Sequence, residues 1–216
     1  MVLDSQRDNV DPLLTKFAKI FKKINPNALT WLALFFSIVA GTFFYFSKPE
    51  TELNTFYLYF AALFVFLNGF FDAVDGKVAK LTGKTSAQGD FLDHALDRYA
   101  DVFIVGGLAL NMGWIPHPEI GFLAIVGMLL TSYMGTQSQA VGCKRNYSGL
   151  LGRADRLVLL MFAPVIQHIL LNFYGVELIY GFTLLECVLI YFAIVGNLTA
   201  IQRFLSTMLW FDKRKN

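Results

Sequence analysis

Long apolar stretches alternate with short polar connections along most of the chain. Each stretch provides the about 20 residues that a helix needs to cross about 30 Å of hydrocarbon. The stretches cover roughly residues 28–47, 55–80, 87–111, 119–142, 154–174 and 179–209. The second and third are apolar in one half only, at 57–71 and 102–110, and continue into polar sequence that is still compatible with a helix. The pattern predicts an all-α integral membrane protein with six transmembrane helices.

The segment before the first stretch has a different periodicity. From Val10 to Ile24, apolar side chains fall on one side of a helix and lysines lie beside them. The apolar set is Leu13, Leu14, Phe17, Ile20 and Phe21, and the lysines are Lys16, Lys19, Lys22 and Lys23. This pattern predicts an amphipathic interfacial helix in the headgroup layer, with a solvated tail as the alternative. We therefore expect a cytoplasmic N-terminal segment at 1–25 and a six-helix membrane domain at 26–216.

Basic residues are divided unequally between the two sides of this bundle. Of the 18 lysines and arginines, 16 lie in the N-terminal segment, the connections after spans two and four, or the C-terminus. Arg98 lies within a span, and only Lys48 lies in the opposite connections. Because cytoplasmic segments retain positive charge, we expect a multi-pass protein of the cell membrane. Both termini and the polar ends of spans two and three would face the cytoplasm.

Composition supports the membrane assignment and narrows the function classes. Hydrophobic residues make up 56% of the chain and charged residues 16%, against about 25% charged residues in soluble domains. The net charge of +2 is too small to indicate a nucleic-acid partner. Cys143 and Cys187 are far apart and form no zinc or redox motif.

Four aspartates stand at helical spacing in the polar ends of spans two and three. Asp72 and Asp75 share one helix face, and Asp93 and Asp97 share a face of the next helix. A turn near 82–86 would bring the two faces together at the same depth. Four bare carboxylates would repel one another there, so we expect a divalent cation. Oxygen ligands without His or Cys favour Mg²⁺, Mn²⁺ or Ca²⁺.

Each of these residues also has an ordinary explanation. A single Asp near a helix end is often a cap, and a single membrane Gly is often a packing residue. His94 points about 100° away from Asp93 on a helix, so we expect it to pack rather than to bind a metal. A cation transporter stays open as another class, although its carboxylates should lie near the bilayer midplane. A structural or adaptor protein would not need four carboxylates in one register.

Residues 72–97 resemble the signature of the CDP-alcohol phosphotransferases, D-x-x-D-G-x-x-A-R, eight residues, and G-x-x-x-D-x-x-x-D. The matching positions are Asp72, Asp75, Gly76, Ala79, Gly89, Asp93 and Asp97. Lys80 stands where the family usually has Arg. Residues 26–30, which read P-N-A-L-T, are similar to the family's entry into span one.

The resemblance implies an enzyme of phospholipid biosynthesis that moves a lipid phosphate from a CDP-activated lipid to an alcohol and releases CMP. It implies that Asp72, Asp75 and Asp93 bind Mg²⁺ or Mn²⁺, with two ions expected. Asp97 would then bind the second ion and act as general base. The residues implied for CDP are Asp72, Gly76, Ala79, Lys80 and Gly89, with Asn27 and Thr30 as weaker candidates. Family members commonly form homodimers, and the lipid substrate lies among membrane lipids.

A second basic cluster, at 144–156, is predicted to face the same side as the aspartates. Arg153 and Arg156 are three residues apart and suit a phosphate on the acceptor. Lys144 and Arg145 suit either the acceptor or anionic headgroups, and Gln137 suits a polyol.

The string G-R-A-D-R-L from residue 152 is similar to family members that use inositol phosphate, archaeal archaetidylinositol phosphate synthases among them. Bacterial relatives of that kind usually have Lys and Arg late in span four, where this chain is neutral. We expect a phosphorylated polyol as acceptor. Inositol phosphate is favoured, and glycerol phosphate and serine remain as alternatives. Whether the lipid is of the diacylglycerol or archaeol type stays open.

Overall fold

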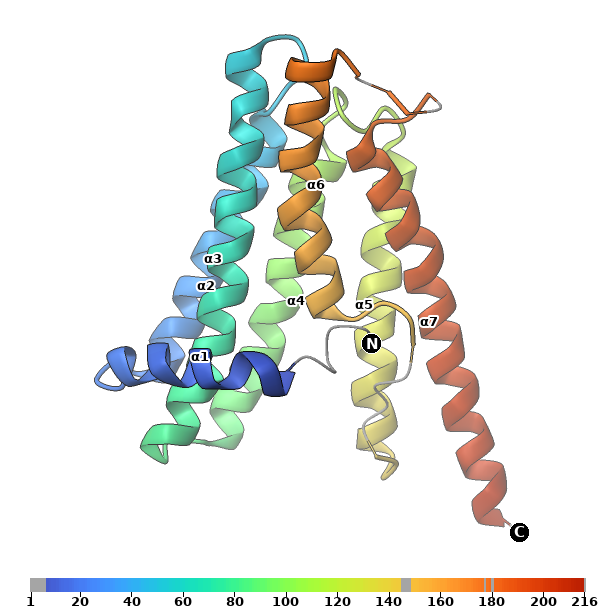
Figure 1. The fold of residues 1–216 in the computed structure, drawn as a ribbon. Helices are drawn as coiled ribbons and strands as arrows, with labels where there is room; N and C mark the ends of the chain where they lie inside the picture. Colours follow the sequence, from blue (N-terminus) through green and yellow to red (C-terminus); the bar gives the residue numbers. More distant parts are fainter. Residues whose placement is uncertain (1–6, 145–148, 177, 180, 216) are drawn as a thin grey trace.

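The computed structural model describes residues 7–144, 149–176, 178–179 and 181–215, which form seven helices and one isolated β-bridge. The helices are α1 (Arg7–Phe21), α2 (Pro26–Phe46), α3 (Glu52–Thr82), α4 (Ala87–Ala109), α5 (Pro118–Ala140), α6 (Arg153–Tyr174) and α7 (Leu184–Lys215). In Figure 1, α2 to α7 run along a common direction, whereas α1 lies across the bundle near the end where α3 turns into α4.

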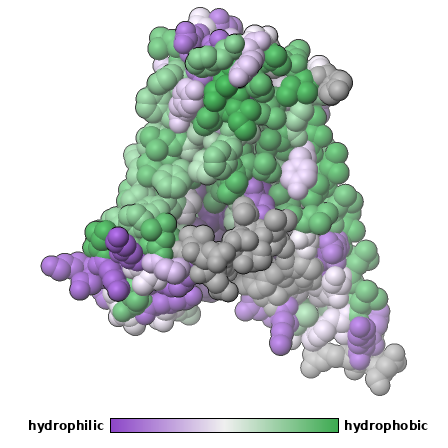
Figure 2. All heavy atoms as spheres, in the orientation of Figure 1, coloured by the Kyte–Doolittle hydropathy of each residue, from purple (hydrophilic) through white to green (hydrophobic). Residues whose placement is uncertain are grey.

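Five of the described helices are long and apolar enough to cross a membrane: α2, α3, α5, α6 and α7. The protein is therefore an all-helical integral membrane protein. Figure 2 shows the matching surface, which is largely hydrophobic along the length of the bundle and hydrophilic at its ends. The helix α4 does not meet the same standard, because it carries five charged residues between Asp90 and Asp101. The prediction of six spans therefore depends on α4.

The helices pack closely where glycines let two backbones touch. The helix α2 packs against α3 and α4, and α5 packs against α7. A Cβ atom at Gly41 of α2 would overlap the carbonyl of Phe103 in α4, and one at Gly107 would overlap the backbone of Gly41. Gly127 and Gly196 make the equivalent approach between α5 and α7. Small residues at such crossings are typical of membrane helices.

The amphipathic helix α1 is held on α3 through its apolar face. The rings of Phe17 and Phe70 meet edge to face with centroids 5.2 Å apart, and Ala18 is fully buried. An ion pair between Asp11 and Lys77 adds a polar contact to the same helix. The helix predicted for residues 10–24 is thus present, although it ends at Phe21.

The helix α3 is longer than a membrane crossing requires. Its 31 residues span about 46 Å at 1.5 Å per residue, against about 30 Å of hydrocarbon. No charged residue lies between Leu53 and Phe71, whereas the part from Asp72 onward carries two aspartates and two lysines.

The last helix differs from its prediction. It begins at Leu184 rather than at residue 179, because Gly181 has a φ of +86° and the Thr183 hydroxyl accepts a hydrogen bond from the N–H of Glu186. Glu186 therefore lies in the first turn of α7 and not in the middle of a span. Arg203, one of the four basic residues that the sequence places near the C-terminus, is buried and donates to the carbonyl of Thr131 at 2.6 Å.

Candidate active site

The turn between α3 and α4 sets the positions of the four signature aspartates. Helix α3 ends at Thr82, because Gly83 takes the left-handed conformation that commonly closes a helix, with φ at 65°. Helix α4 starts after Ser86, whose Oγ accepts a hydrogen bond from the N–H of Gly89 at 3.0 Å. The chain thereby reverses within a few residues and places both pairs of aspartates at one end of the bundle.

Asp72 of α3 and Asp97 of α4 meet at one guanidinium group. Nη1 of Arg153, the first residue of α6, lies 2.6 Å from Asp72 Oδ2 and 2.7 Å from Asp97 Oδ1. Because the two carboxylates come from different helices, the faces that carry the signature oppose each other. The spacing of the aspartates predicts this arrangement, and the contacts confirm it for this pair.

Asp93 stands at the edge of the same group. One ligand atom each from Asp93, His94 and Asp97 lie within 4.8 Å of one another. The His94 ring is 3.7 Å from Asp93 Oδ2 through Nδ1 and 3.6 Å from Asp90 Oδ1 through Nε2. The imidazole is thus nearer to the aspartates than its position on the helix predicts.

Asp75 is the most buried of the four aspartates, with 4% of its surface exposed. Its Oδ2 is buried and has no hydrogen-bond partner among the described residues. The hydroxyl of Thr30, on α2, contacts the same carboxylate. A buried, unpartnered carboxylate oxygen is unfavourable, and a hard cation is the kind of partner that it can bind. The carboxylate ligands present therefore fit Mg²⁺ or Mn²⁺.

The first turn of α2 completes this end of the bundle. A Cβ atom at Gly89 would lie 3.4 Å from Asn27 Oδ1, so the two residues are neighbours. A Cβ atom at Gly76 would meet nothing within 4 Å, which leaves the backbone of α3 open on that side. Of the residues predicted to bind CDP, Asn27, Thr30, Gly76 and Gly89 thus gather near the aspartates.

Residues 23–198 match the sequence profile of the CDP-alcohol phosphatidyltransferase family. This chain belongs to that family. The phosphatidyltransferase is 27% identical over 163 residues to the archaetidylinositol phosphate synthase of Pyrococcus horikoshii, which covers 76% of this chain and 81% of the relative. It is 31% identical over 201 residues to the phosphatidylinositol phosphate synthase of Streptomyces avermitilis, which covers 88% of this chain and 76% of the relative. It is accordingly a transferase of substituted phosphate groups.

The fold of the phosphatidyltransferase is also shared with solved structures. The phosphatidylinositol phosphate synthase of Mycobacterium tuberculosis with CDP-DAG bound superposes with a TM-score of 0.72 at 20% identity, covering 91% of this chain and 94% of that chain. A structure of the same Mycobacterium protein with manganese and citrate gives a TM-score of 0.71 at 20% identity, covering 90% of this chain and 88% of that chain. At this identity the likeness establishes the fold.

Behind the aspartates, the phosphatidyltransferase holds a fifth acidic residue that the signature does not include. Asp101 is 5% exposed, and its Oδ2 accepts a hydrogen bond from Arg156 Nη2 at 2.7 Å. Arg153 Nε is 3.5 Å from its Oδ1, and Arg98 Nη2 is 3.7 Å from its Oδ2. Three arginines from α4 and α6 therefore surround one carboxylate. Asp101 follows Asp97 by four residues, so helical periodicity places it near the same face. This spacing is the sequence feature that indicates its position beside the site.

The residues predicted to bind the acceptor are not all found together. Arg153 and Arg156 lie against the aspartates, as described, and Arg156 is only 4% exposed. Gln137 and Lys144 are exposed near the end of α5 and after it. Arg145 lies outside the described residues. Ala79 is half-buried and Lys80 is exposed at the end of α3.

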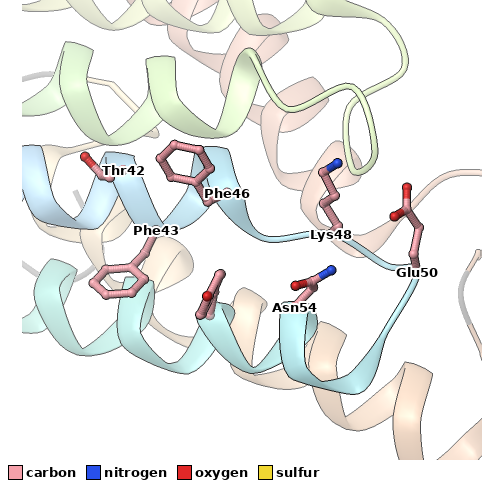
Figure 3. A pocket seen from close by; sticks show the side chains of 7 residues that line it. Thr42, Phe43, Phe46, Lys48, Glu50 and Asn54 are labelled. Atoms are coloured by element: carbon pink, nitrogen blue, oxygen red, sulfur yellow. The ribbon is translucent and has the colours of Figure 1, made fainter.

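The phosphatidyltransferase has one cavity that adjoins the aspartates, on the side of His94 and Arg98, and one that lies far from them. One, of about 550 Å³, opens between α4 and α5 and is lined by Arg98, Ser132 and Thr136 among others. Ser132, which lines this cavity together with Tyr133 and Thr136, accepts a hydrogen bond from Arg98. The other, of about 430 Å³, lies at the opposite end of the bundle, where Figure 3 shows Phe43, Lys48 and Glu50 around it. It contains a single carboxylate and is not a candidate for the transfer reaction.

Proposed function

We propose that this phosphatidyltransferase transfers a lipid phosphate from a CDP-activated lipid to a hydroxyl of a phosphorylated polyol, with inositol phosphate as the favoured acceptor, and releases CMP. The observation that carries the proposal is the meeting of Asp72 and Asp97 at Arg153, within 2.6 and 2.7 Å. This contact links two of the family's signature aspartates to an arginine side chain that can bind a phosphate. Asp72, Asp75, Asp93 and Asp97 are proposed to bind two divalent ions, Mg²⁺ or Mn²⁺.

The donor is proposed to lie over the open backbone at Gly76. Gly76, Ala79 and Gly89 offer the nucleotide a surface without large side chains, and Asp72 lies at its diphosphate end. Asn27 and Thr30 border that surface from α2, and Lys80 is proposed to contact the phosphates. A divalent cation bound by the aspartates would neutralise charge on the diphosphate and on the departing CMP.

Asp97 is proposed as the general base. Its side chain is 13% exposed and is held by Arg153 at 2.7 Å and Arg98 at 3.4 Å, so its carboxylate is fixed in direction. It would accept the proton of the acceptor hydroxyl while the bond from that oxygen to the lipid phosphorus forms. The bond between the same phosphorus and the oxygen of CMP breaks, and CMP leaves as the anion.

The acceptor is proposed to be bound through its own phosphate. Arg153 and Arg156 provide guanidinium groups beside the base, and a guanidinium fork suits a phosphate better than it suits the zwitterion serine. Lys144, Arg145 and Gln137 are proposed to contribute from the adjoining segment. The two named relatives, an archaetidylinositol phosphate synthase and a phosphatidylinositol phosphate synthase, favour inositol phosphate over glycerol phosphate.

The membrane arrangement is part of the proposal. The helix α4 would be the sixth span, covered by its neighbours α2 and α5, and α1 would lie in the cytoplasmic headgroup layer. Residues 1–25 would form a cytoplasmic segment and 26–216 the membrane domain. Both termini and the aspartates would face the cytoplasm, where the positive charges gather. We also propose that the enzyme is a homodimer.

CMP release by the purified protein tests this function. The reaction would contain Mg²⁺ or Mn²⁺ and CDP-diacylglycerol or CDP-archaeol, with inositol phosphate, glycerol phosphate, free inositol or serine added one at a time. We expect release with inositol phosphate alone and none when the cation is chelated. The Asp93→Asn variant, purified in the same way, is the control. Because it lacks a proposed metal ligand, any CMP release that it retains would come from a contaminating synthase.

Each other outcome of that experiment corrects a different part. Release with glycerol phosphate or serine in place of inositol phosphate would retain the chemistry and replace the acceptor. Uptake of Mn²⁺ into liposomes without any CDP-lipid, together with no CMP release, would contradict the enzyme and support the transporter.

A further inference from the structure

Arg153 holds two of the carboxylates that the proposed function assigns to divalent cations. Its Nη1 atom lies 2.6 Å from Asp72 Oδ2 and 2.7 Å from Asp97 Oδ1. One nitrogen therefore bridges α3 and α4, and it contacts carboxylate oxygens that Mg²⁺ or Mn²⁺ would need as ligands. Contacts as short as these leave no space for a cation between the nitrogen and either oxygen.

The rest of the guanidinium group is poorly satisfied in this position. Nη2 and Nε of Arg153 are buried and have no hydrogen-bond partner among the described residues. The Nε atom has only an ionic contact, 3.5 Å from Asp101 Oδ1. A guanidinium group has five N–H donors, so the side chain keeps unused donors that a phosphate could accept from.

Asp101 is fixed independently of Arg153. Arg156 donates to it at 2.7 Å, and Arg98 lies 3.7 Å away. Asp101 is also one helical turn beyond Asp97, on the side away from the other aspartates. It can therefore keep attracting Arg153 when the contacts with Asp72 and Asp97 are broken.

We propose that Arg153 and the divalent cations exchange places at Asp72 and Asp97, and that Asp101 retains the displaced guanidinium beside the site, where it binds the acceptor phosphate. This inference depends on the proposed function, because it assigns the aspartates to the cations. A guanidinium group and a divalent cation repel each other and compete for the same oxygens. Cation binding therefore breaks the ion pairs of Arg153 with Asp72 and Asp97 and leaves Arg153 free to bind the acceptor phosphate.

The exchange predicts positive cooperativity between the divalent cation and the acceptor phosphate. A phosphate that engages Arg153 removes a competitor of the cation, and a cation that displaces Arg153 frees a ligand of the phosphate. Linkage requires the two effects to be equal in size. Arg153 is then a positioning residue for the cation as well as a binding residue for the acceptor.

Mn²⁺ affinity of the purified full chain, measured without any CDP-lipid, tests the exchange. We expect Arg153→Gln to bind Mn²⁺ at least about tenfold more tightly than the unmodified chain, because the competing charge is gone. Inositol phosphate should tighten Mn²⁺ binding by the unmodified chain and should have no such effect in Arg153→Gln. Arg203→Gln is the matched control, since it removes a buried arginine that hydrogen-bonds Thr131 instead, and its Mn²⁺ affinity should not rise.

Arg153→Lys keeps the positive charge and provides a second variant if Arg153→Gln does not fold. Because its ammonium group keeps a positive charge that still competes with the cation, a smaller gain in Mn²⁺ affinity is expected than for Arg153→Gln. Equal Mn²⁺ affinity in all variants, with cation-dependent CMP release retained by the unmodified chain, would overturn the exchange alone. No Mn²⁺ binding by the unmodified chain would overturn the cation assignment and the exchange together.

Discussion

At the end of the bundle opposite the aspartates, three neutral buried side chains form one hydrogen-bonded network, and the buried carboxylate of Glu186 lies beside it in the first turn of α7. The Asn111 side chain donates to the carbonyls of Phe44 and Ser47 and accepts from the N–H of Gly113. Trp114 Nε1 donates to Ser47 Oγ at 2.9 Å. These bonds close the end of α2 onto the loop after α4, and each group has a partner.

At the aspartate end the buried groups are charged and their partners are incomplete. Asp75 Oδ2, Arg98 Nε and two nitrogens of Arg153 have no hydrogen-bond partner among the described residues. Burial of unpartnered charge lowers stability, whereas the neutral network at the other end contributes to it. The comparison indicates that one end maintains the fold and the other keeps groups available for ligands.

The largest expected effect comes from removing the proposed base. Asp97→Asn should lower the rate of CMP release about 10³-fold, because the amide cannot accept the hydroxyl proton. The thermal midpoint should stay close to that of the unmodified chain. Asp90→Asn is the control, since Asp90 is an exposed carboxylate on the same helix. An Asp97→Asn rate within tenfold of the original would remove Asp97 from the role of base.

The second effect should fall on stability at the neutral end. Asn111→Ala leaves the carbonyls of Phe44 and Ser47 without this donor and should cost about 2 kcal/mol of unfolding free energy. For a chain of this size that corresponds to a drop of about 6 °C in thermal midpoint. CMP release per folded molecule should not change. Asn54→Ala, a half-buried asparagine at the same end, should lower the midpoint far less.

A smaller effect is expected where the aspartate end is open. Gly76→Ala adds a methyl group that meets nothing within 4 Å, so the fold should tolerate it. The methyl group would occupy space proposed for the donor and should raise KM for the CDP-lipid about tenfold, which corresponds to about 1.4 kcal/mol. Gly106→Ala is matched, because its added Cβ also meets nothing within 4 Å but lies far along α4. Equal KM values for the two variants would move the donor away from Gly76.

The smallest effect concerns the position where this chain departs from the family signature. Lys80→Arg should lower KM for the CDP-lipid by less than about threefold, since the residue is exposed and its charge is screened by salt. Lys84→Arg, which is also exposed, is the control. A larger improvement, found for Lys80→Arg alone, would show that the guanidinium fork contacts the diphosphate directly.

The sequence predicted those features that depend on local spacing. The turn at 82–86 and the repeat of Asp72, Asp75, Asp93 and Asp97 are properties of two neighbouring helices, and helical periodicity determines which side chains share a face. The contact of Arg153 with Asp72 joins residues 81 positions apart. It depends on how α6 packs against α3, which no local pattern specifies.

Hydrophobicity alone was also a poor guide to the depth of charged residues. Arg203 has the sequence context of a basic C-terminus, yet the close approach of α5 and α7 at Gly127 and Gly196 carries it inside the bundle. The predicted last span begins at residue 179 and the helix at Leu184, so Glu186 lies in the first turn rather than two turns inside the helix. In both cases tertiary packing, and not composition, decides where the charge lies.

The length of α3 has a consequence for how the enzyme would be assayed. Because α3 is about 16 Å longer than one thickness of hydrocarbon, the proposed membrane arrangement would place its aspartates at the boundary between lipid and water. The proposed polar acceptor would arrive from solution, whereas the proposed CDP-lipid would diffuse only within the leaflet. The reaction rate should therefore follow the mole fraction of CDP-lipid in the membrane or micelle, and dilution with inert detergent should slow the enzyme at constant bulk concentration.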